Sequence, residues 1–80
     1  GEMISPCQIS HLPENTIVEG AHVGLDVRRR RLRVAKALPD PTALATVEVA
    51  EYELRDTDAA LMVFEYLNMH RSRFKSVKIV

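Results

Sequence analysis

The chain has 80 residues, of which 46% are apolar and 28% charged, and eleven basic and eleven acidic side chains give a formal net charge of zero. This length allows one hydrophobic core, and the composition is that of a folded globular domain rather than a disordered chain. With zero net charge, the protein as a whole has no electrostatic attraction to nucleic acid or to an anionic membrane surface. No apolar run approaches the ~18 residues of a membrane span, and the N-terminus lacks the sections of a secretory signal.

Few side chains suit catalysis or soft-metal binding. Cys7 is the only cysteine, so no internal disulfide and no site with several thiolates can form within one chain. His11, His22 and His70 are scattered, and no paired carboxylates, glycine-rich phosphate loop or metal-ligand spacing occurs. We therefore expect no enzyme, no cofactor and no metal site. The lone thiol and the lack of a secretion signal indicate an intracellular, cytoplasmic protein.

The N-terminal residues differ in pattern from the rest of the chain. Residues 1–15 contain Pro6 and Pro13 and show no sustained hydrophobic period, so we expect an extended arm. Residues 16–80 should form a single α+β domain. Its first strand is predicted at 23–27, where apolar residues alternate with polar or small ones.

A hairpin is predicted at the centre of this domain. Strands at 30–38 and 42–54 flank Pro39 and Pro41. Each proline removes an amide donor and fixes a φ angle, so the loop must lie between the two strands.

The charges of these two strands indicate their register. With Leu32 opposite Val49, every acidic residue of the second strand meets an arginine. Opposite charges across a ladder contribute roughly 0.2 to 1 kcal/mol each, so they specify register more than they stabilise the fold. The other predicted pairs are Val34–Val47, Arg30–Glu51, Arg28–Glu53, Arg33–Glu48 and a cation–π contact between Arg29 and Tyr52.

A helix is predicted from Asp56 to His70. Asp56 is a natural N-cap, and Asp58 lies in the first turn, where the helix dipole favours a carboxylate. A final strand follows at 76–80. The predicted fold is thus α+β: a small antiparallel sheet of three to four strands packs on one helix, residues 56–70, in the C-terminal half of the chain.

The element order after Arg30 is similar to the second half of a ferredoxin-like fold, the split βαβ arrangement of RNA-recognition domains. Two departures limit what this resemblance implies. The strand at 45–51 carries no aromatic residue for stacking on RNA bases, and Gly20 and Gly24 disfavour the helix that the first half would need. No family is assigned on this basis.

The predicted helix carries two apolar stripes, although a helix that covers one sheet needs one. The stripe expected to lie on the sheet consists of Ala60, Val63, Phe64 and Leu67. Met62, Tyr66 and Met69 form a second stripe about 100° round the helix. This second stripe is either exposed for a partner or covered by apolar residues of segment 3–12.

The basic residues at 28–36 allow two interpretations. As a binding site, Arg29, Arg31, Arg33 and Lys36 would hold phosphate groups of a nucleic acid. As structural residues, they would pair with the acidic strand. Zero net charge and the lack of interleaved aromatics favour the structural interpretation.

The sequence therefore favours a non-enzymatic module for protein–protein interaction or oligomerisation, with a homodimer as one form. It would bind through Met62, Tyr66 and Met69 or through an edge strand. The alternative is a nucleic-acid or phosphate-binding domain that uses the basic strand at 28–36. The partner, the cellular process and whether the chain is part of a larger protein do not follow from the sequence.

Overall fold

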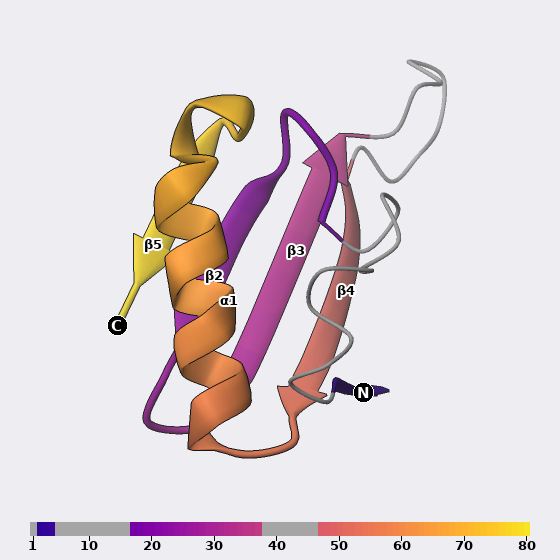
Figure 1. Ribbon diagram of the computed structural model, residues 1–80. Coiled ribbons are helices and arrows are strands. Elements are labelled where there is room, and N and C mark those ends of the chain that lie inside the picture. The colour runs from indigo at the N-terminus through magenta and orange to yellow at the C-terminus, as the bar shows by residue number, and fades with distance from the viewer. Residues whose placement is uncertain (1, 5–16, 38–46) are drawn as a thin grey trace.

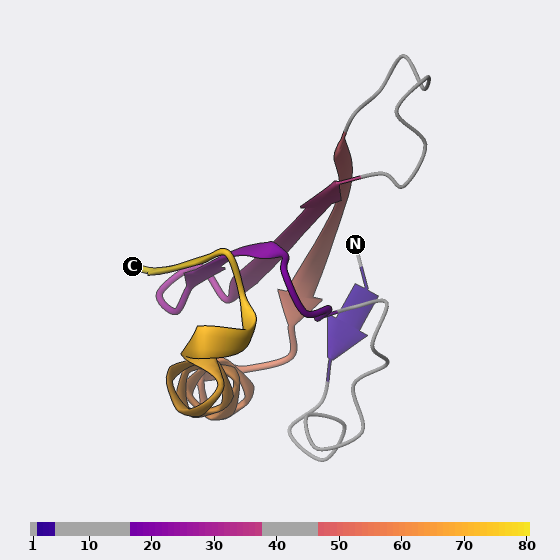
Figure 2. The ribbon, with the colours of Figure 1, turned by 90° about the horizontal axis from the view of Figure 1, so that it is seen from above.

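The computed structural model describes residues 2–4, 17–37 and 47–80 (Figure 1). One sheet and one helix make two layers, and the helix covers one face of the sheet, while no other element of the described residues covers the opposite, open face (Figure 2). In chain order the elements are β1 (Glu2–Ile4), β2 (His22–Asp26), β3 (Arg31–Ala37), β4 (Val47–Leu54), α1 (Thr57–Met69), the 3-10 helix η2 (Arg71–Arg73) and β5 (Ser76–Ile79).

The predicted helix is confirmed, and its caps explain its bounds. Asp56 has an extended backbone, and its Oδ1 accepts a hydrogen bond from the Ala59 N–H at 2.8 Å, which satisfies a donor of the first turn. Asp58 also lies in this turn. At the other end, the His70 N–H donates to the Tyr66 carbonyl at 3.0 Å. The N-cap and C-cap thus fall at the two residues that bound the predicted helix.

The α+β fold class is confirmed, and the sheet is mixed rather than wholly antiparallel. Its order is β1-β4-β3-β2-β5. The hairpin pairs β2–β3 and β3–β4 are antiparallel, whereas β1–β4 and β2–β5 are parallel. The parallel pair with β5 arises because α1 carries the chain back over the sheet in a right-handed crossover from β4 (Figure 1).

The strand predictions hold within the described residues. The strands predicted at 23–27, 30–38 and 76–80 correspond to β2, β3 and β5, and the described part of 42–54 contains β4. In the predicted arm, residues 2–4 form β1, and the rest of the arm lies outside the described residues. The proline loop lies outside them too.

The predicted register of the hairpin is wrong. Leu32 faces Tyr52 instead of Val49, and Val34 faces Ala50 instead of Val47. The displacement is an odd number of residues, so the opposite set of β4 side chains turns toward the helix. Leu54 is therefore buried at 1% exposure, whereas Val49 is 46% exposed on the open face.

The predicted charge pairs are also wrong, because the observed register places other residues of β4 opposite the basic residues of β3. Opposite charges nevertheless face each other across β3 and β4 in three places: Arg31–Glu53, Arg33–Glu51 and Lys36–Glu48. Tyr52 lies opposite Leu32, so the cation–π contact predicted for Arg29 does not form. The pairs predicted for Arg28 and Arg30 are wrong for the same reason. The charges recur along both strands, so more than one register brings opposite charges together.

The core lies between α1 and the helix-facing side of the sheet. The stripe predicted to face the sheet is confirmed: Ala60, Val63 and Leu67 are buried, and Phe64 is half-buried against them. The buried residues are Ile17, Ala21, Val23, Leu25, Leu32, Val34, Leu54, Ala59, Ala60, Val63, Leu67 and Phe74. Ala59 and Ala60 fill the buried face in the N-terminal half of α1 with small side chains.

Replacing the N-cap should destabilise the domain by leaving a first-turn donor unpaired. We expect Asp56→Ala to lower the free energy of unfolding by about 1 kcal/mol. Asp58→Asn should cost less, because it removes a favourable charge at the helix dipole and no cap hydrogen bond. Urea denaturation of both variants measures the difference, and equal losses would contradict the capping role of Asp56.

Candidate functional site

The structure places the second helix stripe on one side of α1, next to its buried face. Met62 and Met69 are 41% and 78% exposed, and Tyr66 is half-buried between them. The Tyr66 ring lies 4.6 Å from the His70 ring, centroid to centroid, at an interplanar angle of 47°. We call Met62, Tyr66 and Met69 the α1 flank. It brings together all three residues that the sequence named as partner-binding.

Sequence reasoning missed one exposed apolar residue of the same helix. Leu61 is 47% exposed and belongs to neither predicted stripe. Its signal in the sequence was the interruption of the polar side of the helix, between Asp58 and Glu65, by a leucine. The outer surface of α1 is therefore more apolar than two stripes alone would make it.

The alternative cover for the α1 flank cannot be placed. Segment 3–12 lies outside the described side chains, so packing of its apolar residues over the helix stays a hypothesis.

The four basic residues proposed for phosphate binding do not share one surface. Strand alternation puts Arg31 and Arg33 on the open face of the sheet, opposite Glu53 and Glu51. Lys36 lies on the other face, the face that α1 covers further along the sheet. Arg31, Arg33 and Lys36 therefore do not lie on one face of the sheet.

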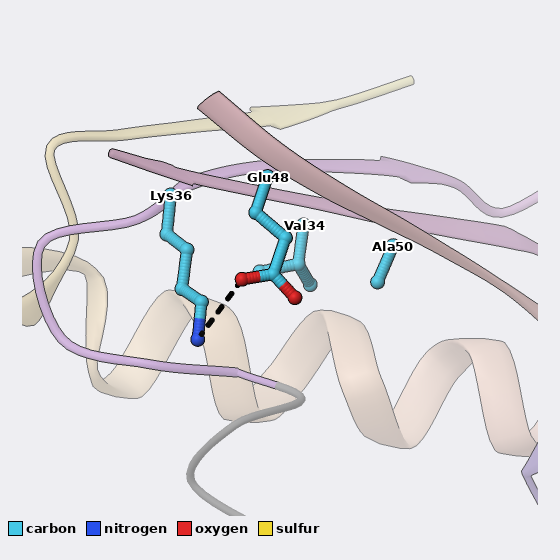
Figure 3. A pocket seen from close by; sticks show the side chains of 4 residues that line it. All are labelled: Val34, Lys36, Glu48 and Ala50. Carbon is cyan, nitrogen blue, oxygen red and sulfur yellow. Dashed lines mark ion pairs between the residues drawn. The ribbon is translucent and has the colours of Figure 1, made fainter. Parts of the chain in front are cut away.

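Lys36 and Arg29 each lie close to an acidic side chain. Lys36 Nζ lies 3.7 Å from Glu48 Oε2 (Figure 3). In the turn between β2 and β3, Arg29 Nε lies 3.9 Å from Asp26 Oδ2, and the Arg29 N–H donates to Asp26 Oδ1 at 2.9 Å. Two of the four candidates thus have acidic partners within the described part of the chain.

A shallow hollow lies beside the Lys36–Glu48 pair. Val34, Lys36, Glu48 and Ala50 line it (Figure 3), and its volume of about 10 Å³ is near the minimum for one water molecule. The hollow is too small for a substrate or cofactor.

The histidines within the described residues make local contacts. His22 Nδ1 and Ser76 Oγ share a hydrogen bond of 2.8 Å between β2 and β5. His70 caps α1 and lies against Tyr66. Cys7 and His11 lie outside the described residues, and the described ones contain no group of three potential metal ligands.

The free edge at β5 carries a basic segment that sequence reasoning did not single out. Arg71, Arg73, Lys75 and Lys78 are all exposed, and residues 71–80 contain no acidic side chain. The signal was present in the sequence as four cations in ten residues.

Comparison with known proteins gave no match to a protein-family model, to a curated protein or to a solved structure. Within residues 2–4, 17–37 and 47–80, no helix combines the length and hydrophobicity needed to cross a bilayer. The argument about function therefore rests on the surfaces of the domain itself.

The two sides of α1 should respond differently to truncation. Leu67→Ala removes a fully buried side chain, so we expect it to lower the free energy of unfolding by about 2 to 5 kcal/mol. Met69→Ala should change it by less than about 0.5 kcal/mol, because this side chain packs little in the monomer. Denaturant unfolding at low protein concentration tests both. A large loss for Met69→Ala would mean that the α1 flank is part of the core.

Proposed function

We propose that the domain is a non-enzymatic protein-interaction module that associates with a second copy of itself through the α1 flank. The observation that supports this is the exposure of Met62 and Met69 on a helix whose sheet-facing side is already filled. Methionine suits adaptable contact surfaces, and clustered exposed apolar side chains favour association.

The charges at the two ends of α1 favour a second copy in the antiparallel orientation. Asp56 and Asp58 lie at the N-terminal end, and Arg71 and Arg73 follow the C-terminal end. A two-fold axis that relates two antiparallel helices sets the acidic end of each against the basic end of the other. The helix dipoles are also opposed favourably in this orientation.

The spacing along α1 allows apolar and charged contacts to form together. If Met62 lies opposite Met69 of the second copy, Asp58 of one helix lies near the C-terminal end of the other helix, which Arg71 and Arg73 follow. Glu65 then lies near the two-fold axis, close to Glu65 of the second copy. Repulsion between these two carboxylates opposes association.

This contact is small. A pair of helices as short as α1 buries less than the roughly 1,200 Å² of a standard interface. Association also costs about 4 kcal/mol or more in lost translational and rotational freedom. We therefore expect a weak, reversible dimer with a Kd of about 10 µM to 1 mM.

Sedimentation velocity over a wide range of concentration tests the proposal. The wild type should move from monomer toward dimer, and Met62→Glu and Met69→Glu should stay monomeric, because each buries an unpaired charge in the contact. Asn68→Glu is the matched control: it adds the same charge to an exposed site on another side of α1 and should dimerise as the wild type does.

Charge exchange tests the orientation within the same experiment. Asp58→Arg and Arg73→Asp should each weaken the dimer, and the double variant should restore it. Glu65→Gln should tighten it. A wild type that is monomeric throughout, or flank variants that associate as the wild type does, would contradict the proposal.

The alternative, nucleic-acid or phosphate binding through Arg29, Arg31, Arg33 and Lys36, has less support. Phosphate binding along a strand needs cations on one face, and these four are divided between two faces and a turn. Arg31 and Arg33 also stand opposite glutamates. Their arrangement supports a structural role in the hairpin.

A further inference from the structure

We infer that the β5 edge, defined as residues 71–80, accepts an acidic extended segment of another protein as an additional strand of the sheet. This surface shares Arg71 and Arg73 with the proposed dimer contact but includes no residue of the α1 flank, and the inference does not depend on association of two copies. The mode is β-strand addition, in which backbone hydrogen bonds provide affinity and alternate side chains provide specificity.

The edge of β5 is open to pairing. β5 is the last strand of the sheet, and within the described residues β2 is its only strand neighbour (Figure 1). The Val80 N–H donates to the Leu25 carbonyl at 2.8 Å, and the Val80 carbonyl accepts from the Val27 N–H at 3.3 Å. Strand alternation then directs backbone groups of Val77 and Ile79 away from β2, toward the side where another strand can bind.

The charge of this edge selects an acidic partner. Arg71, Arg73, Lys75 and Lys78 are exposed, and no ion pair to any of them occurs within the described part of the chain. On the open face, Lys78 lies beside Gly24 of β2, whose other neighbour is Arg33 of β3. Since Gly24 has no side chain, these two cations flank open space above the sheet.

The side chains on the other face of β5 define the alternating residues of the partner. Val77 and Ile79 point to the helix side and are only half-buried, as is Phe64 of α1. A strand added beside β5 would cover these residues further if its inward side chains were apolar. The expected partner thus alternates apolar side chains, facing the core, with acidic side chains beside Lys78.

The same charges disfavour other occupants. A lysine on an edge strand commonly prevents edge-to-edge aggregation, and two β5 edges together would bring eight cations into one contact. Binding to single-stranded nucleic acid favours exposed aromatics, whereas Phe74, the aromatic residue of this segment, is only 8% exposed.

An NMR titration with short synthetic peptides tests the inference. A peptide that alternates valine and glutamate should protect the Val77 and Ile79 amides from hydrogen exchange, and a valine–lysine peptide should not. Methylation of alternate peptide nitrogens should abolish binding, since it removes the backbone donors without changing charge. Lys78→Glu should weaken binding about three- to tenfold.

Two variants act as controls. Arg55→Glu makes the same reversal of charge at an exposed site beyond β4 and should leave peptide affinity unchanged. Met69→Glu should bind the peptide as the wild type does, so failure of strand addition can be distinguished from failure of helix association.

Three results would overturn the inference. The valine–glutamate peptide could leave the Val77 and Ile79 amides unprotected. A single-stranded oligonucleotide could bind in its place, with loss on Lys78→Glu, which would identify an anion surface for nucleic acid. Protection that rises with protein concentration alone would show that the edge pairs with a second copy.

Discussion

Burial of Leu54 beneath the start of α1 is the constraint that arranges the rest of the domain. Leu54 ends β4, and Asp56 caps the helix two residues later, so the chain must turn from the sheet onto its covered face at this point. Leu54 can be buried only if the even-numbered side chains of β4 face the helix. Glu51 and Glu53 then lie on the open face, opposite Arg33 and Arg31. The charge ladder is therefore a consequence of burial.

This order of causes explains what the sequence could and could not predict about the fold. Caps and periodicity are local, so the helix and four strands could be placed from residues near them. Register is a relation between distant segments, and complementary charges recur along both strands of the hairpin. Burial of Leu54 decides the register, and that burial depends on where α1 lies. The parallel β5 was predictable in principle, since a helical crossover within one sheet joins parallel strands.

The candidate surfaces were likewise predictable from the sequence only where they depend on local spacing. Spacing alone places Met62, Tyr66 and Met69 together, because helix geometry is local. Their exposure depends on what the rest of the chain covers and could not be read from spacing. The division of the basic residues was available from parity, since Arg31 and Arg33 alternate onto one face and Lys36 onto the other. The β5 edge needed the strand order, which is a property of the whole fold.

Arg73 connects the two proposed surfaces. In the antiparallel dimer it belongs to the basic end that meets the acidic end of the second copy, and at the β5 edge it contributes to the attraction of an acidic strand. One guanidinium cannot pair fully with a carboxylate of the second copy and with a carboxylate of the acidic strand. Binding at either surface should therefore weaken binding at the other by no more than one exposed ion pair, about 0.2 to 1 kcal/mol. Linkage makes this antagonism reciprocal. A domain with these two surfaces would release its second copy slightly more readily when an acidic strand is bound, without any change in the core.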